Sequence, residues 1–410
     1  MDRTIDEIRT RLRAKPMPGG DMPLFVASAD WHLCRSAWRR SGIDGDAAYG
    51  LRQVVDLCLA LDVPLLAAGD LLDTTDPDPD DVRVVREQMQ RMEAAALRVF
   101  YVQGQHELDR ERPWLSAIHA WPVHVGDPSE SHDFCGRLRI RGLDWQPAGR
   151  LQEELAKPRG DKADVLLCHQ AWQDFMGDDG SRSEGAFAEV RDHFVLTGDY
   201  HRHVVATYTP LGGPSVSGTA YSPGSTHMTS IDERERKGVF LFSKTDDMDC
   251  HFGLRADSVW LRSRPVRRFA VTDEGELEEL LTHGLPMALE DAAAEAADLP
   301  EHLRRPLVRV IYAADIPGAL RRLEAARRNL FHLFPKCVPT PVDAATRASA
   351  RRIVEGGLGA ALAARGVPEA VRRDAGRLLR ADDPERAVDE LCADYLAARA
   401  LDRAAETETA

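Results

Sequence analysis

An aspartate and a histidine two positions apart, Asp30 and His32, are the first residues whose types and spacing suit metal chemistry. They follow the apolar run 24–29, which predicts a short buried strand. Side chains two residues apart at a strand end point to the same side of the chain. One divalent metal ion can therefore use both the carboxylate and the imidazole. Taken alone, the pair is more typical of a surface turn, so the prediction depends on how the other strands end.

Four later apolar segments also end in residues that bind metal ions. In open α/β sheets, ligand sites gather at the carboxyl ends of the strands. A Gly-Asp pair by itself usually marks a turn, and a single histidine usually belongs to a core, but five such ends in order predict one shared site. The four ends are Gly69-Asp70, Gly104-Gln105-His106-Glu107, His169 and Gly198-Asp199-Tyr200-His201.

The types of these residues narrow the chemistry of the site. Glycine precedes the polar residue at three of the ends, which lets the backbone turn sharply towards a common centre. Aspartate, histidine and amide ligands without cysteine favour manganese, iron or zinc. There are enough ligands for two ions, an arrangement that performs phosphoryl chemistry. We place Asp73 and Glu107 outside the ligand set, as groups that support ligands or face solvent.

Alternating strands and helices must position these residues. Amphipathic stretches at 47–61 and 80–96 lie between the first three apolar strands, which predicts stacked βαβ units and an α/β fold. The later strands follow one another closely, so this half is expected to lean antiparallel. The predicted strands are 24–29, 64–68, 97–102, 138–143, 165–168, 194–197, 204–208 and 238–242.

The rest of the chain predicts three further parts around this domain of residues 22–262. A polar extension, 1–21, precedes it. A smaller α/β unit, 263–336, follows it, and residues 337–410 are rich in alanine and arginine with apolar residues at helical spacing. The predicted elements of the smaller unit are strands 268–271 and 307–312 and helices 274–281 and 316–327.

Composition limits the classes of function. The 410 residues carry a net charge of -14, with 43% hydrophobic and 29% charged residues, as expected for a globular protein in the cytoplasm. No segment resembles a signal peptide or a membrane span, and the seven cysteines form no Cys-x-x-Cys pair. An acidic protein that acts on DNA needs local basic patches, bound metals or a partner. Two arginine clusters, at 262–268 and 321–322, suit phosphate contacts or are ordinary solvated faces.

The strand ends resemble those of the calcineurin-like metallophosphoesterases, most closely the SbcD-type DNA repair nucleases. Several short motifs are similar to those of that subfamily. They are 28–33 (Ser-Ala-Asp-Trp-His-Leu), 68–74 (Ala-Gly-Asp-Leu-Leu-Asp-Thr), 221–226 (Tyr-Ser-Pro-Gly-Ser-Thr), and Glu233 followed by the Lys-Gly-Val-Phe of 237–240. The similarity spans about residues 22–265. It implies a metallophosphoesterase β-sandwich flanked by helices. The smaller α/β unit would be a capping domain and the helical C-terminus an ATPase-binding segment, both by position.

The resemblance implies a role for each strand end. Two divalent cations would neutralise the scissile phosphate and promote attack by water. Asp70 would bridge the two ions. His106 would protonate the leaving oxygen or steady the phosphate, unless it is only a structural neighbour. The implied ligands are Asp30, His32, Asp70 and His201 for the first ion, and Asp70, Gln105, His169 and Asp199 for the second.

Two departures from the family pattern concern the second ion. Gln105 stands where the family usually has asparagine, and Asp199 where it usually has histidine. An anionic oxygen in place of a neutral nitrogen favours harder ions such as manganese or magnesium. A different register would make His203 the ligand in place of Asp199, although it would misplace Gly198 at the strand end.

Three functions are compatible with this pattern. The first is a manganese-dependent DNA nuclease, a 3′-to-5′ exonuclease with single-strand endonuclease activity that works as a homodimer with an SbcC-like ATPase. The second is a phosphodiesterase or phosphatase that acts on a small phosphoester, which the acidic composition favours. The third is a weakly active scaffold subunit that binds DNA ends or the ATPase.

Overall fold

The computed structural model describes most of the chain up to residue 338. Apart from residues 3–4 and 337–338, the predicted N-terminal extension and the helical C-terminal region lie outside the described residues. Internal contacts divide the chain into two compact units, Met1–Tyr312 with Pro317–Lys336 and Ala313–Ile316 with Cys337–Ala410. The candidate site lies in the first unit. The described residues are 3–4, 22–33, 43, 45–134, 138–156, 163–176, 183–212, 217–245, 253–327 and 330–338.

A seven-stranded sheet forms one layer of the fold, in the order β1-β13-β12-β2-β3-β4-β5. Its strands β2 to β5 are parallel, and β12 is antiparallel to both β2 and β13. The strands β2, β3 and β4 carry the ligand-rich ends predicted from the sequence. The strands are β1 (Arg3–Thr4), β2 (Met22–Ser28), β3 (Leu65–Ala68), β4 (Val99–Val102), β5 (Val123–His124), β12 (Gly238–Lys244) and β13 (Leu254–Trp260).

A six-stranded sheet, in the order β10-β11-β9-β8-β7-β6, forms the second layer. The predicted antiparallel tendency is correct for β10 with β11 and for β6 with β7, but β7, β8, β9 and β11 are parallel neighbours. Helical crossovers between β7, β8 and β9 allow this. The strands are β6 (His132–Phe134), β7 (Leu138–Leu143), β8 (Val165–His169), β9 (Phe194–Gly198), β10 (Val204–Tyr208) and β11 (Gly218–Ser222).

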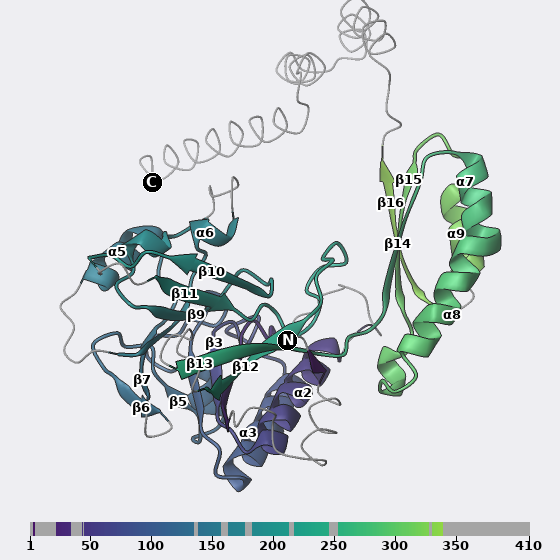
Figure 1. Ribbon diagram of the computed structural model, residues 1–410. Coiled ribbons are helices and arrows are strands. Elements are labelled where there is room, and N and C mark those ends of the chain that lie inside the picture. The colour runs from purple at the N-terminus through teal and green to yellow at the C-terminus, as the bar shows by residue number, and fades with distance from the viewer. Residues whose placement is uncertain are drawn as a thin grey trace, which may run out of the picture. The chain divides into compact units, whose positions relative to one another are not determined.

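Alternate residues of the strands face two different cores, which explains their continuous apolar runs. Phe25 and Leu66 of the first sheet pack with Leu167 of the second in the core between the sheets. Their neighbours Val26 and Leu65 face a separate core beneath the helices that cover the first sheet. The structure is therefore a β-sandwich flanked by helices, an α/β metallophosphoesterase-like fold, as predicted (Figure 1).

Helices cover the outer faces of both sheets. α2 and α3 pack side by side over the first sheet, and the shorter α5 and α6 pack on the second (Figure 1). Asp78 caps α3 by accepting a hydrogen bond from the Asp80 amide at 2.8 Å, and proline occupies the first helical position. The helices are α2 (Asp46–Leu61), α3 (Pro79–Ala94), α4 (Trp114–Ile118), α5 (Ala148–Ala156), α6 (Gln173–Met176) and η2 (Phe187–Glu189).

A separate three-stranded sheet, β14-β15-β16, follows the sandwich in the chain. The predicted strands and helices all occur here, and β16 is an additional strand that the sequence did not indicate. The elements are β14 (Val266–Val271), α7 (Glu274–Glu279), η4 (Leu280–Gly284), α8 (Leu285–Glu295), η5 (Glu301–Leu303), β15 (Leu307–Ala313), α9 (Ala319–Arg327) and β16 (His332–Val338).

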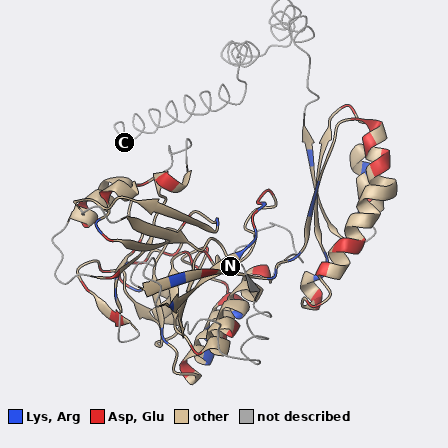
Figure 2. Ribbon diagram, in the orientation of Figure 1, with Lys and Arg blue, Asp and Glu red and all other residues tan. Residues whose placement is uncertain are grey.

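Two of the helices beside this third sheet, α7 and α8, are acidic, whereas α9 carries three arginines and one glutamate. α7 has glutamate at four of its six positions, and acidic side chains continue along α8 (Figure 2). Such a surface repels a phosphate backbone. Within the described ranges, no helix has both the length and the apolar character needed to cross a lipid bilayer.

Candidate metal centre

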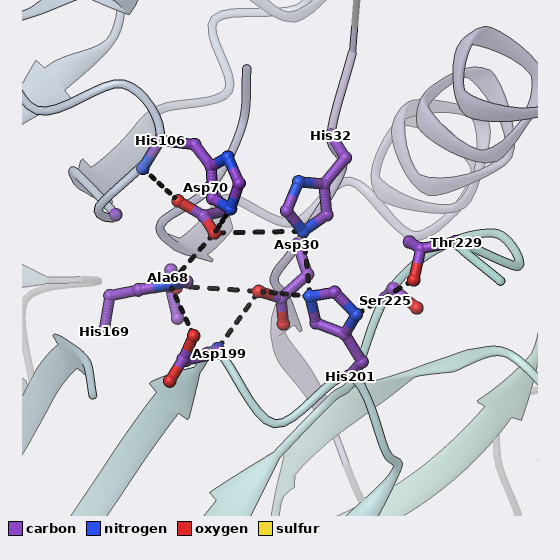
Figure 3. Close-up of polar contacts among 12 residues, drawn as sticks. Asp30, His32, Ala68, Asp70, His106, His169, Asp199, His201, Ser225 and Thr229 are labelled. Atoms are coloured by element: carbon purple, nitrogen blue, oxygen red, sulfur yellow. Dashed lines mark hydrogen bonds and ion pairs between the residues drawn. The ribbon is translucent and has the colours of Figure 1, made fainter. Parts of the chain in front are cut away.

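The carboxyl ends of five strands meet and bring all seven predicted ligands together. Figure 3 labels all of them except Gln105. β2, β3 and β4 are neighbours in one sheet, β8 and β9 are neighbours in the other, and β8 contacts both β3 and β4. The site therefore lies at the seam between the two layers. Asp30 and His32 follow β2, Asp70 follows β3, Gln105 follows β4, His169 ends β8, and Asp199 and His201 follow β9.

Five of the seven residues have a left-handed backbone. Such φ values are uncommon for residues other than glycine, although aspartate and histidine tolerate them better than most. The strain is of the kind found at functional sites, where the surrounding structure maintains it. The φ values are 50° for Asp30, 43° for His32, 48° for Asp70, 80° for Asp199 and 56° for His201.

One group of ligand atoms comes from Asp30, His32 and His201. The Nε2 atoms of the two histidines lie 2.9 Å apart, and His201 Nε2 is 3.8 Å from Asp30 Oδ1. His32 Nδ1 lies 2.8 Å from the Asp73 carboxylate, which fixes the proton on Nδ1 and leaves a lone pair on Nε2. Asp73 therefore contacts a predicted ligand, which is the first of the two roles that the sequence left open for it.

A second group overlaps the first and consists of Asp30, Asp70 and His169. His169 Nδ1 bonds to the Ala68 carbonyl at 2.7 Å, so this nitrogen donates and Nε2 faces Asp70 Oδ2 at 3.3 Å. Asp70 Oδ2 also lies 3.8 Å from His32 Nε2. Asp70 thus lies between the histidines of the two groups, where a bridging ligand would be expected.

Gln105 and Asp199, the two departures from the family pattern, contact each other. Gln105 Nε2 donates to Asp199 Oδ1 at 2.6 Å, and the same carboxylate oxygen is 3.8 Å from His169 Nε2. The Asp199 amide donates to Asp30 Oδ1 at 3.0 Å. Both side chains therefore reach the centre, and the longer glutamine side chain is accommodated by its bond to the carboxylate.

His106 lies at the open side of the centre. Its side chain is 41% exposed, whereas those of His32 and His169 are fully buried. His106 Nε2 is 3.8 Å from Asp70 Oδ2, and Nδ1 is 3.6 Å from Asp73 Oδ1. An imidazole in this position can reach a group that enters from solvent.

Unsatisfied polar atoms show that the residues fit a bound cation. A buried carboxylate oxygen without a hydrogen bond is costly, and several facing one another repel. Divalent cations would satisfy them together, since aspartate, histidine and amide oxygen are suitable ligands for such ions. Within this centre, the buried atoms without a hydrogen-bond partner are Asp30 Oδ2, Asp70 Oδ2, Gln105 Oε1 and His169 Nε2.

The electrostatics of the centre agree with this assignment. Burial raises the pKa of Asp30 to about 7, although nearby imidazoles act in the opposite direction. Burial also opposes ionisation of Asp70, but His169, His32 and His106 outweigh it and hold the pKa of Asp70 below its usual range. Burial would lower the pKa of His169, yet Asp70 and the other carboxylates raise it well above the usual value. The carboxylates and imidazoles of the centre therefore interact strongly with one another, and a bound cation would add positive charge to this group of buried carboxylates.

His203, the alternative to Asp199, is not brought into this centre. Its Nδ1 lies 3.0 Å from the Pro223 carbonyl and its Nε2 lies 2.8 Å from the Ser258 hydroxyl. The ring stacks on Phe240 at a centroid distance of 4.0 Å. The geometry therefore favours the register that uses Asp199.

Several residues that support His201 were not predicted from the sequence. The His201 ring contacts Thr229, and the Lys237 ammonium donates to the His201 carbonyl at 3.2 Å and to the Ser225 hydroxyl at 2.8 Å. Glu233 and Lys237 belong to the motifs that resemble those of the SbcD-type nucleases, and this resemblance was the sequence feature that could have identified them. Thr229 has no such feature, because its role depends on a loop that folds back.

Glu107 also supports the site without belonging to it. Its buried carboxylate accepts hydrogen bonds from the Leu72 amide at 2.6 Å and the Gly104 amide at 3.3 Å. These bonds join the loops that follow β3 and β4. Burial, with a contribution from Asp70, raises the pKa of Glu107 to about 8.

Glycine at a strand end allows the close approach that the sequence suggested, and Gly198 provides a test. It pairs with His169 across β8 and β9, and an added Cβ would clash with the Ala68 carbonyl and lie 2.5 Å from His169 Nδ1. We expect Gly198→Ala to lower the free energy of unfolding by about 2 kcal/mol or more, through overpacking. Chemical denaturation of the metal-free protein measures this change.

Gly149→Ala is the matched control for this substitution. Gly149 lies in α5, and an added Cβ would meet no atom within 4 Å. Alanine is the better helix former, so this variant should be as stable as the wild type or more stable by about 0.5–1 kcal/mol. Equal stability of the two variants would contradict the tight packing around His169.

The arginine clusters are largely engaged within the chain. Arg264 forms an ion pair with Asp46 at 3.1 Å, and Arg267 forms one with Glu295 at 2.8 Å. Arg322 contacts Glu274 at 3.4 Å. These contacts favour a structural role for the clusters over phosphate binding.

The chain has an α/β metallophosphoesterase-like fold with candidate metal-binding side chains at its strand ends. No protein-family model matches the sequence. The chain is a weak homologue of the DNA double-strand break repair protein Mre11 of Haloferax volcanii, with 27% identity over 232 residues. The alignment covers 55% of this chain and 50% of that protein, so the chain spans about half the length of this relative.

A comparison with solved structures adds nothing further to this relationship. One crystal structure aligns with 54% of this chain and 95% of its own, at 10% identity and a TM-score of 0.34. That likeness is too low to bear on fold or function. The narrower similarity to the SbcD-type nucleases stays a prediction.

Proposed function

We propose that this chain is a two-metal phosphodiester hydrolase that acts on DNA. The observation that carries this proposal is the pair of overlapping ligand groups that share Asp30 and contain buried acceptors without hydrogen-bond partners. The weak homology to a DNA double-strand break repair protein supports DNA as the substrate. The specific activity would be SbcD-like, a 3′-to-5′ exonuclease and single-strand endonuclease in repair or recombination.

The seven residues at the strand ends would hold the ions. Asp30, His32, Asp70 and His201 would bind the first ion, and Gln105, His169 and Asp199 would complete a second site with Asp70. Bound divalent ions would offset the negative charge of the phosphate and promote its attack by water. The carboxylate of Asp199 in place of a neutral ligand favours Mn²⁺, with Mg²⁺ as the next choice, over softer ions.

His106 would act on the substrate from the open side. Its exposed ring can donate a hydrogen bond or a proton to an oxygen of a phosphodiester at the metal centre. Asp73, which lies close to both His106 and His32, would orient the two rings together. The buried ligands would hold the ions that bind the phosphate, and His106 would serve the leaving oxygen.

The partners follow from the same proposal. An SbcC-like ATPase would bind the region 337–410, and the protein would act as a homodimer in the cytoplasm. The smaller α/β unit, 263–336, would serve as a capping domain. Because α7 and α8 are acidic and Arg267 is paired with Glu295, the DNA would be contacted elsewhere, at the metal centre itself or on the ATPase.

The direct test is hydrolysis of labelled DNA by the purified protein. With Mn²⁺ we expect nucleotides to be released from the 3′ end of a duplex and a single-stranded circle to be cut. With a chelator in place of Mn²⁺, both activities should be absent. If DNA stays intact while Mn²⁺ is bound, the protein is not a nuclease by itself, and the same assay with a co-purified ATPase distinguishes a scaffold from an enzyme that needs its partner.

A second candidate is a phosphodiesterase for small phosphoesters. The net charge of -14 favours it over DNA, and so do the ion pairs of Arg264 and Arg322, because arginines that are paired with carboxylates are less available to contact a phosphate backbone. Turnover of a nitrophenyl phosphodiester without cleavage of DNA would support this function and contradict the first.

A further inference from the structure

The segment Met228–Lys237 connects the metal centre with the three-stranded sheet. We propose that Glu233 is a positioning residue for His201 and that Arg268 of β14 holds Glu233 in place, so that the third sheet sets the metal affinity of the centre. This inference rests on the proposed metal-binding function. It assigns a role to residues outside the ligand set.

The contact at the metal centre fixes which nitrogen of His201 carries the proton. His201 Nδ1 lies 3.0 Å from the Thr229 hydroxyl, which in turn donates its proton to the Glu233 carboxylate. A hydroxyl has one proton, so Thr229 must accept from His201 Nδ1. The proton is therefore held on Nδ1, and the Nε2 lone pair points towards Asp30 and His32 (Figure 3). Glu233 thus selects the tautomer that can bind a metal ion.

Lys237 completes the support for the ring. Its ammonium is 2.5 Å from Glu233 Oε2 and also bonds to the His201 carbonyl and the Ser225 hydroxyl. The Lys237 side chain is only 2% exposed, so these interactions are weakly screened by water. The carboxylate and the His201 backbone are consequently held by one buried cation.

The other side of the segment is attached to the third sheet. The Arg268 guanidinium donates to the Ile231 carbonyl at 2.9 Å and to the Glu233 carbonyl. Ile231 shares an apolar cluster with Leu307 of β15, and Val266 of β14 packs against it. Arg268 therefore binds the backbone of the residue whose side chain holds Thr229.

The segment also has space beside it. A cavity of about 430 Å³ lies between residues 200–202 and residues 230–235 of the segment. Glu233 therefore borders open space on one side, into which its side chain could move. Moving its carboxylate away from Thr229 releases the hydroxyl proton, and the preference of His201 for the Nδ1 tautomer is lost.

The test compares Mn²⁺ affinity across four variants of the full chain. Glu233→Gln and Thr229→Val remove the carboxylate charge and the hydroxyl, and loss of such supporting groups weakens metal binding by about 10–100-fold. Arg268→Ala should weaken it in the same direction by about tenfold. Thr229→Ser keeps the hydroxyl and should bind Mn²⁺ like the wild type. Free Mn²⁺ measured by electron paramagnetic resonance gives affinity and stoichiometry together.

Arg267→Ala is the matched control for Arg268→Ala. It removes the same charge from the adjacent position of β14, but its partners are Glu295 and the Ala288 carbonyl. We expect its Mn²⁺ affinity to stay within twofold of the wild type. Equal affinities for Arg267→Ala and Arg268→Ala would overturn the link to the third sheet.

A second measurement does not need metal. In the metal-free protein, ¹⁵N chemical shifts of His201 should show the proton on Nδ1 in the wild type and in Thr229→Ser. Glu233→Gln and Thr229→Val should shift it towards Nε2. An unchanged tautomer in both variants overturns the role of Glu233. If the wild type shows the Nδ1 tautomer but takes up no Mn²⁺, the proposed metal function fails while the positioning of His201 stands.

Discussion

His106→Ala should abolish DNA hydrolysis while the protein still binds its metal ions. Loss of a group that donates a proton in the transition state lowers turnover by about 10²–10⁴-fold. The seven predicted ligands do not include His106, so Mn²⁺ stoichiometry should be unchanged. Steady-state cleavage of labelled duplex DNA, with metal content measured on the same sample, checks both statements.

The substrate can separate the two roles open to His106. The nitrophenolate leaving group of a nitrophenyl phosphodiester departs as a stable anion and needs no proton. A general acid therefore contributes little to the hydrolysis of this substrate. If His106 protonates the leaving oxygen, His106→Ala should hydrolyse a nitrophenyl phosphodiester almost as well as the wild type. If His106 steadies the phosphate, His106→Ala should hydrolyse DNA and the nitrophenyl phosphodiester more slowly by the same factor.

A histidine remote from the centre provides the control. His283 lies in η4 beside Glu279, with a side chain that is 69% exposed. His283→Ala should retain full activity on either substrate. Loss of Mn²⁺ from His106→Ala, in contrast, would mean that His106 is a ligand and that its assigned role is wrong.

Asp70→Asn should remove metal binding together with activity. Asp70 Oδ2 lies within 3.8 Å of three imidazole Nε2 atoms, those of His32, His106 and His169. Asparagine keeps the shape but removes the charge that faces both ligand groups. We expect fewer than two Mn²⁺ ions per chain and turnover reduced by about 10³-fold or more.

Thermal unfolding gives an independent measure of the same loss. One ion at a hundred times its dissociation constant stabilises the folded state by about 2.7 kcal/mol. The wild type should therefore melt at a higher temperature with Mn²⁺ than with a chelator, and Asp70→Asn should lose most of this difference. Asp298→Asn removes one carboxylate at a surface ion pair with Arg262. This variant should keep the difference in melting temperature between Mn²⁺ and chelator. A normal response to Mn²⁺ in Asp70→Asn would contradict a central role for this carboxylate.

Gln105 and Asp199 show how two departures from a family pattern can compensate each other. The glutamine amide donates to the Asp199 carboxylate at 2.6 Å, which leaves Gln105 Oε1 buried without a partner. A histidine at position 199 would have no second oxygen to share between the amide and a metal ion. The two residues are therefore expected to change together, and the second ion site that we propose for them would carry one more negative charge than one with a histidine at position 199.

The sequence predicted the layout of the site because strand ends obey a simple rule. Apolar runs that are buried on both faces are recognisable as strands, and ligands gather where parallel strands end. Asp30, Asp70 and His169 could therefore be assigned to one site before their distances were known. The same rule gave no information on β16, whose sequence mixes apolar residues with lysine, cysteine and proline.

The tertiary structure decided what a linear pattern cannot express. His201 and His203 are equivalent as sequence letters, but a left-handed backbone at Asp199 and His201 directs one ring to the centre and the other against Phe240. The support of His201 by Thr229 spans 28 residues and depends on a folded-back loop. The sequence by itself thus determined which residue types stand at the strand ends, because the apolar pattern of a buried strand can be recognised from residues that are neighbours along the chain. Their protonation, their outer contacts and their link to the third sheet depend on long-range packing, so only the tertiary structure could decide them.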